Sequence, residues 1–470
     1  MRRTVMQTLT ALVLVFGLAL VSTTLIAQER VPISRPSSIW SHAPIVPSGP
    51  TPRIAPKSPT LAGTTILQSY DGVDFLGSNC DCLPPDNGTA VGGNYVVEVV
   101  NVQIRIFDKT TGAILLDEPL QTFFGQPSDG DPYMVYDELA DRWFMNAFNS
   151  DASGLILAAS KTNNPLGGWY IYNLNNVGGF PDFAKPGYNK DAIFVSLNDF
   201  GSNGGYIGVA TIDKAAAYSG TLVYYFTYPP FLQFRAMPPA RFHGDTTGGT
   251  EWFASIDQGG GNALRVTKMT NYLSNSPHYT TWLLPVNAYQ QFVAADQPGG
   301  PGTVADNDPT TTEVQIHNKR LVTAAWASTA RDGFLYPKGL YYQVDLHTAT
   351  PIFMQEGLID PGPGVGVYMV SADQDKNGNI GATWMESSNS EYVSMWVGTR
   401  PAIFPYGAIN ANQVAPGGGF MPYSFRTGDY SSTVLDSDGL TFWSANEYIG
   451  NDGNGNNTDI WLTHISSYHK

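Results

Sequence analysis

The sequence predicts an all-β protein that folds as a single β-propeller with seven blades. Beyond Thr64 there is almost no apolar pattern with the helical period of about 3.6 residues. Short runs of β-branched and aromatic residues recur instead, separated by turns rich in Gly, Asn and Asp. A loose unit of strand, polar turn and strand repeats along the chain, which is typical of blades that bury their faces against their neighbours.

Each repeat is marked by the aromatic or aliphatic residues that open the strand after its polar turn. In chain order these residues are Tyr95, Trp143-Phe144, Ile193-Phe194, Trp252-Phe253, Leu321-Val322, Ile380 and Phe442-Trp443. The units average about 57 residues, longer than compact propeller repeats, so we expect long loops. A pair of β-sandwiches or a solenoid would also explain short strands and is the alternative.

The ring of blades must close, and the two ends of the repeat region are suited to this. We expect the first strand, around Thr65 to Tyr70, to pair with the last blade, which ends at residues 461–465. The best helix candidate, Asp213 to Tyr218, would make one or two turns at most.

The N-terminal region is expected to lie outside the fold. Residues 1–27 combine a basic start with an apolar run that ends in Ala27, which predicts a secretory signal peptide, with a retained membrane anchor as the alternative. Residues 28–63 are dense in Pro and Ser and predict an extended linker. The propeller domain is then expected at residues 64–470. These features predict a secreted or extracytoplasmic protein.

The composition limits the classes of partner. The chain has 470 residues, 42% hydrophobic and 14% charged, with a formal net charge of −15. An acidic balance argues against nucleic acid or an anionic membrane as a partner held by general electrostatics. No segment after the signal peptide is long and apolar enough to span a membrane, and we expect a monomer.

Cys80 and Cys82 are the chain's two cysteines. In an oxidising compartment they would form a strained local disulfide or remain free thiols. A metal site would need two further thiolate or imidazole ligands, and no histidine is near them in sequence.

Acidic residues recur about twelve positions ahead of the strand-opening residues, where an innermost strand would enter the ring. The set consists of Asp86, Asp131, Asp182, Asp308 and Asp429, with Lys185 and Arg426 three residues from two of them. One interpretation is that each Asp closes a turn by binding nearby backbone amides. The other is that these side chains converge on the axis of the ring and bind a ligand, with Lys185, Arg426 or a cation such as Ca²⁺ balancing the carboxylates.

A calcium site is predicted separately at Asp373, Asp375 and Asn377. The run from Asp373 to Ile380 matches the first eight positions of an EF-hand loop. Trp384 stands where the loop needs a bidentate Glu, so the EF-hand interpretation fails. A hairpin turn and a propeller-type Ca²⁺ loop are the two interpretations left.

Signatures of known enzyme classes are mostly absent. The sequence has no Gly-x-Ser-x-Gly elbow, no His-Glu-x-x-His and no phosphate-binding Gly-x-x-x-x-Gly-Lys. Its 7 histidines show no metal-ligand spacing. Glycoside hydrolysis needs only two carboxyl groups that are neighbours in space, and Asp131, Asp429 and Glu447 are the candidates.

Several motifs together resemble a family of large secreted bacterial β-propeller proteins of unknown function, similar in appearance to the sialidase-like propellers. They are Asp86 to Gly92, Asp129 to Pro132, Phe180-Pro181-Asp182, and Gly428-Asp429-Tyr430-Ser431 with Glu447-Tyr448. The resemblance covers most of residues 66–466 and implies the fold and export, without an established catalytic residue. The arginine cluster of a sialidase is not recognisable, which argues against that activity.

Two functions follow as hypotheses. The first is a binding module for an extracellular glycan or protein, in which Tyr and Trp residues of the loops would stack on sugars and Tyr430 is one of the predicted ligand-binding residues. The second is a glycoside hydrolase or polysaccharide lyase that uses carboxylates where the inner strands enter the ring.

Overall fold

A computed structural model describes residues 63–470, apart from 79–81, 176, 202–204, 231–235, 305–309, 332–333, 403–407, 422–426 and 451–459. The chain divides into two compact units, residues 1–40 and 41–470, and all described residues belong to the second. The predicted signal peptide and all of the predicted linker except Gly63 lie outside the described residues. The domain boundaries therefore stay predictions. None of the described helices has the length and apolar character of a membrane span.

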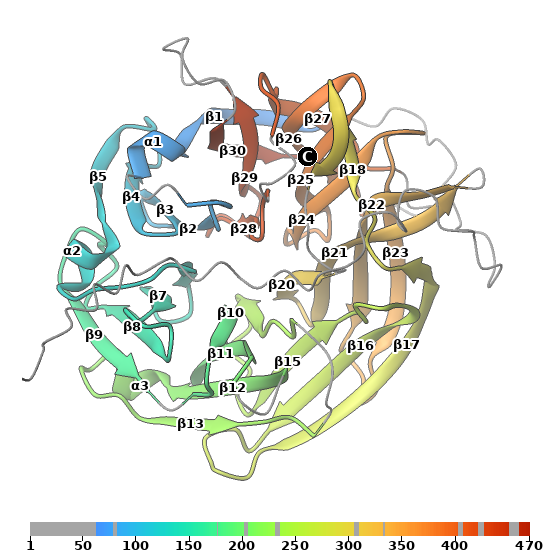
Figure 1. Cartoon of the computed structure of the whole chain (residues 1–470). Helices are drawn as coiled ribbons and strands as arrows, with labels where there is room; N and C mark the ends of the chain where they lie inside the picture. Colours follow the sequence, from blue (N-terminus) through green and yellow to red (C-terminus); the bar gives the residue numbers. More distant parts are fainter. Residues whose placement is uncertain are drawn as a thin grey trace, which may run out of the picture. The chain divides into compact units, whose positions relative to one another are not determined.

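The fold is an all-β propeller, as the sequence predicts, and its sheets are arranged around a common axis (Figure 1). Three sheets are antiparallel meanders of four consecutive strands. Their strands are β2 (Gly88–Gly92), β3 (Tyr95–Val100), β4 (Gln103–Asp108) and β5 (Ile114–Pro119); β6 (Tyr133–Asp137), β7 (Arg142–Phe148), β8 (Leu155–Ser160) and β9 (Trp169–Leu174); β24 (Gly366–Gln374), β25 (Ile380–Ser388), β26 (Glu391–Arg400) and β27 (Asn410–Ala415).

A fourth sheet closes the ring with strands from both ends of the domain. It contains β28 (Ser432–Leu435), β29 (Phe442–Gly450), β30 (Ile460–His469) and β1 (Thr65–Asp74). Tyr70 is the register partner of Ile465, so the predicted pairing of the first strand with the last blade is confirmed.

The remaining large strands form one twelve-stranded sheet. It contains β10 (Pro181–Tyr188), β11 (Ala192–Asp199), β12 (Tyr206–Asp213), β13 (Tyr224–Thr227), β14 (Ala240–His243), β15 (Thr250–Ser255), β16 (Gly260–Thr270), β17 (His278–Gln290), β20 (Thr310–His317), β21 (Arg320–Arg331), β22 (Phe334–Asp345) and β23 (Ile352–Ile359). Strand β14 pairs in parallel with both β10 and β20, because innermost strands run side by side in the same direction. These pairings join neighbouring blades, so the count of seven blades stays a prediction.

The other elements are short. Strands β18 (Ala295–Gln297) and β19 (Gly300–Val304) pair with each other, and the helices are α1 (Phe75–Ser78), α2 (Leu120–Phe124) and α3 (Lys214–Ala217). Helix α3 lies inside the predicted Asp213 to Tyr218 segment, and the Asp213 carboxylate accepts a hydrogen bond from the Ala216 amide, 2.9 Å away. This N-cap explains why the chain makes one helical turn here.

The core lies between neighbouring sheets rather than within one. One cluster combines Val97 and Ile104 of the β2–β5 sheet with Trp143 and Ile156 of the β6–β9 sheet, all fully buried. Burial of such side chains is the main stabilising contribution, and it requires the neighbouring blade.

Candidate functional site

Six of the eight predicted ligand-binding residues are described, and Asp308 and Arg426 lie outside the described residues. We call the six residues the entrance cluster: Asp86, Asp131, Asp182, Lys185, Asp429 and Tyr430. Five of them lie just before or at the start of an innermost strand, β2, β6, β10 or β28, and Lys185 lies within β10. All are at most 7% exposed.

The backbone gives one reason for the recurring aspartates. Asp86, Asp131 and Asp429 have φ angles of 52°, 48° and 69°. This left-handed region is unfavourable for most residues, and Asp is among those that tolerate it because its short side chain can bind locally. Asp182 precedes a left-handed residue instead, and its carboxylate accepts a hydrogen bond from the Phe183 amide at 2.8 Å.

The same residues also meet in space. The Tyr430 hydroxyl donates a hydrogen bond to the Asp131 carboxylate at 2.8 Å. Asp86 and Asp131 both lie close enough to Lys185 to act on its charge. The left-handed turns thus place the carboxylates of Asp86 and Asp131 near Lys185.

Lys185 is the most unusual member of the cluster. Its Nζ lies 3.0 Å from the centroid of the Tyr430 ring, 3.9 Å from that of Tyr133 and 4.4 Å from that of Phe183. Burial lowers the pKa of Lys185 well below its usual range, although Glu313 and Asp131 oppose this. Its Nζ has no hydrogen-bond partner among the residues that the structure describes. The ring faces of such an aromatic cage attract the charged form of the lysine, in addition to the nearby carboxylates.

Below this cluster a polar network that the sequence did not predict ties inner strands together. Glu313 on β20 is bound by Arg241 on β14 at 2.7 Å and by the Tyr133 hydroxyl on β6. Its other oxygen accepts from the Ser371 hydroxyl at 2.5 Å and from the Thr433 amide at 3.2 Å. Burial alone would lower the pKa of Arg241, but the charge of Glu313 outweighs it and raises that pKa. The alternation of Glu313 with Gln315 and His317 was the available signal, since residues two apart share one face of a strand.

A second polar cluster contains Asp373, which was predicted as a calcium ligand. Its carboxylate lies 3.1 Å from His243 Nε2 and accepts from the Leu435 amide at 2.8 Å. His243 Nδ1 lies 3.3 Å from Glu138. Burial opposes protonation, but Asp373 and Glu138 raise the pKa of His243 well above its usual value. Asp373 thus faces an imidazole partner brought from another strand.

The other two predicted calcium ligands lie in a turn. One carboxylate oxygen of Asp375 accepts hydrogen bonds from the backbone amides of Asn377 and Asn379, each at 2.8 Å. This arrangement is that of a carboxylate-capped hairpin turn. In the described part of the chain no group of three His, Cys, Asp or Glu residues is arranged to hold a metal ion. Calcium binding stays a prediction.

Glu447, a predicted catalytic candidate, lies in β29 and is fully buried. One of its carboxylate oxygens accepts a hydrogen bond from the Gly428 amide. The other has no partner among the described residues. Burial raises the pKa of Glu447 well above its usual value, and the nearby charge of Asp429 adds to this.

Cys82 is disulfide-bonded, so the free-thiol alternative does not hold for it. Cys80 lies outside the described residues.

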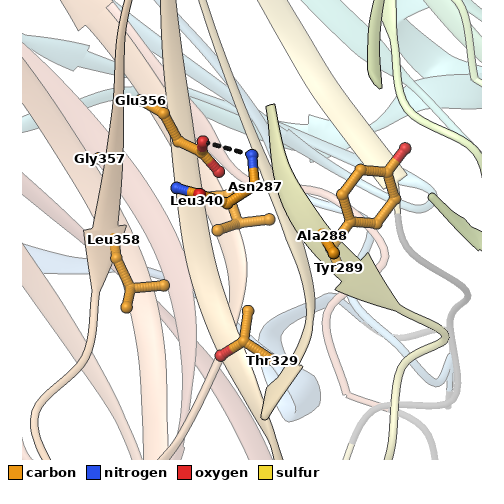
Figure 2. A pocket seen from close by; sticks show the side chains of 8 residues that line it. All are labelled: Asn287, Ala288, Tyr289, Thr329, Leu340, Glu356, Gly357 and Leu358. Atoms are coloured by element: carbon orange, nitrogen blue, oxygen red, sulfur yellow. Dashed lines mark hydrogen bonds between the residues drawn. The ribbon is translucent and has the colours of Figure 1, made fainter. Parts of the chain in front are cut away.

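Two hollows lie away from the axis. A cavity of about 20 Å³ lies between β17 and the strands β22 and β23 (Figure 2). In it Glu356 accepts from the Asn287 amide at 2.8 Å, and burial raises the pKa of Glu356 to about 7. A space of this size suits a single water molecule. A larger hollow, of about 270 Å³, lies between β5, α2 and β9.

No protein-family model and no curated protein sequence matches the chain. Among solved structures, hydrazine synthase of Kuenenia stuttgartiensis is similar with a TM-score of 0.42 and 11% identity, covering 77% of this chain and 93% of that chain. Drosophila plexin A, in complex with semaphorin 1b, is similar with a TM-score of 0.38 and 9% identity, covering 86% of this chain and 87% of that chain. An exo-β-1,3-galactanase of Phanerochaete chrysosporium is similar with a TM-score of 0.33 and 8% identity, covering 85% of this chain and 96% of that chain. These distant likenesses assign no function to this protein.

Proposed function

We propose that this protein is an extracytoplasmic binding module that recognises a glycan through the entrance cluster. The supporting observation is a concentration of buried polar atoms that have no hydrogen-bond partner among the described residues. They are Lys185 Nζ, both amide atoms of Asn87, Thr427 Oγ1, Ser431 Oγ and Glu447 Oε1. Each unmatched buried group costs about 1–3 kcal/mol, so such a set in one place indicates a site for polar ligand atoms.

These atoms belong to one region of the molecule. Asn87 follows Asp86, which acts on Lys185. The Tyr133 hydroxyl, under the same lysine, donates to the Ser431 carbonyl at 3.2 Å. The Thr89 amide donates to the Ser432 hydroxyl at 3.0 Å, which joins β2 to β28. The unmatched groups are therefore gathered where β2, β10 and β28 begin.

The chemistry of the set favours a sugar over other polar ligands. A sugar hydroxyl both donates and accepts, and the set offers donors in Lys185 and Asn87 and acceptors in Asn87 and Glu447. The ring of Phe183, which is partly exposed, supplies apolar surface beside them. Asp131 and Asp182 each keep 7% of their surface exposed and mark the side from which a ligand would approach.

The test begins with a glycan array probed with the mature protein, followed by calorimetric titration of the best oligosaccharide. Lys185→Met keeps the aliphatic stem and removes the donor, and we expect affinity to fall by up to about tenfold, the loss of one hydrogen bond. Lys268→Met, on β16, is the control and should bind normally. A negative array, or equal affinity of Lys185→Met and wild type, would refute the proposal. A high-resolution structure with only ordered water at these atoms would do the same.

A second candidate is a glycoside hydrolase or polysaccharide lyase. It is favoured by one observation, the carboxyl pair Glu447 and Asp429, in which burial raises the pKa of Glu447. A carboxyl group whose pKa is raised by burial, next to a second carboxyl group, is the arrangement of a general acid and its partner. Turnover of an array-positive oligosaccharide should then be abolished by Glu447→Gln with binding retained. If Glu447→Gln still turns over the oligosaccharide, the hydrolase or lyase function is refuted, whereas the proposed glycan binding is not affected by this result.

A further inference from the structure

The hollow between β5, α2 and β9 is a second candidate site. These three elements lie on the outer side of the ring, away from its axis (Figure 1). It lies at the outer end of the core layer that separates the β2–β5 sheet from the β6–β9 sheet, because Leu116, Phe123, Trp169 and Ile171 all pack on that core. Leu166 stands at its edge and is 42% exposed. The volume of about 270 Å³ accommodates a large side chain.

The walls of the hollow are held in place before any ligand arrives. Gln126 and Asn173 exchange two amide hydrogen bonds of 3.1 and 3.2 Å, which tie the segment after α2 to β9. Phe123 meets Trp169 edge to face, with ring centroids 5.2 Å apart. A ligand would therefore find a formed site, and binding would require little ordering of the protein.

The lining restricts the chemistry of the ligand. Its apolar members are Leu116, Phe123, Pro165, Leu166, Trp169 and Ile171. The only polar side chains are Glu118 and Thr122. The Trp169 indole N–H already donates to the Pro165 carbonyl at 2.9 Å, so this ring offers apolar surface alone.

The apolar side chains of the lining match a large apolar side chain of a ligand, and the polar groups of the lining match the polar atoms of a peptide beside that side chain. Glu118 is the one charged residue of the lining, and the whole chain carries a formal net charge of −15. Charge complementarity then favours a ligand with a positive group beside its apolar part.

We propose that the hollow docks a peptide segment of a partner protein, in which a large apolar side chain enters between the blades and an adjacent Lys or Arg pairs with Glu118. The partner is thus a protein with a basic surface, and this contact is independent of glycan binding at the entrance cluster. Apolar anchors in formed pockets supply most of the affinity of such contacts, and charges at their edge supply selectivity.

The test uses a random peptide library displayed on phage and panned on the mature full-length protein. We expect selected peptides to share a large apolar residue followed closely by Lys or Arg. The synthetic consensus peptide should bind about tenfold more weakly to Leu166→Asp, because a charge would be buried at the contact. Leu283→Asp, on β17, is the matched control because Leu283 is 58% exposed, and it should bind like wild type.

A charge exchange tests the pairing with Glu118. Glu118→Lys should weaken the consensus peptide and strengthen a peptide whose basic residue is replaced by Glu. Circular dichroism shows whether each variant is folded. A library that yields no common apolar anchor, or peptide binding that is unchanged in both Leu166→Asp and Glu118→Lys, would overturn the proposal.

Discussion

Glu98 makes the closure of the ring sensitive to pH. It lies on β3, fully buried, and accepts a hydrogen bond from the Val73 amide of β1 at 2.9 Å. Arg105 donates to the Gly72 carbonyl at 2.6 Å, and a Cβ atom on Gly72 would lie 2.3 Å from the Glu98 carboxylate. The carboxyl group is therefore packed against the strand that joins the N-terminal end of the domain to the last sheet.

Burial raises the pKa of Glu98 from 4.5 to about 7. Because this pKa is higher in the folded than in the unfolded chain, the contribution to stability is fully present below pH 4.5 and is lost as the pH rises through 7. At about 1.4 kcal/mol per pKa unit, the loss amounts to roughly 3 kcal/mol. Glu98→Gln mimics the protonated group and should abolish this loss.

The assay is urea denaturation of wild type and Glu98→Gln at pH 5 and pH 8. From pH 5 to pH 8, we expect the free energy of unfolding of Glu98→Gln to rise by roughly 3 kcal/mol relative to that of wild type. Burial also raises the pKa of Glu356 and of Glu386 to about 7, but both groups are present in both proteins and cancel in the comparison. Glu118→Gln is the control and should follow wild type. Equal pH dependence of wild type and Glu98→Gln would refute the reasoning.

Three further predictions concern other parts of the fold. Glu313→Gln leaves the Arg241 charge buried without its 2.7 Å partner and should lower the free energy of unfolding by about 3–5 kcal/mol in urea; a loss below about 1 kcal/mol would contradict this. Gly357→Ala places a Cβ atom 1.7 Å from the Tyr341 ring and should cost about 1–3 kcal/mol by overpacking, measured as a lower Tm, unless the ring can move aside. If residues 373–378 bind Ca²⁺, excess chelator should lower the calorimetric Tm. An unchanged Tm would contradict the predicted calcium site.

The sequence could predict those features that depend on neighbours along the chain. Alternating β-branched and aromatic runs indicated strands, because successive side chains of a strand point to opposite faces. The recurrence of Asp at strand entrances indicated special backbone positions, and Asp86, Asp131 and Asp429 have left-handed φ angles. Pairing of the first strand with the last followed from the need of a ring to close.

The sequence could not show which polar groups meet between different inner strands. Glu313 and Arg241 are 72 positions apart, and His243 meets Asp373 from a different strand. Asp373 was therefore grouped with Asp375 by its spacing along the chain, although its carboxylate binds His243. A buried ion pair leaves no local signal, because each partner satisfies the other only after the strands have been placed side by side.

What the sequence by itself determined is the all-β class, the strand-turn-strand pattern and the special backbone positions of Asp86, Asp131 and Asp429, since these follow from local conformation and side-chain periodicity. The tertiary structure decided the rest: the cage around Lys185, the burial of Glu98 against β1, and the hollow between β5 and β9. Each of these depends on the radial packing of blades, which brings together segments that are distant in the chain and removes them from water. Burial away from water shifts the pKa values of these groups and leaves some polar atoms without hydrogen-bond partners among the described residues.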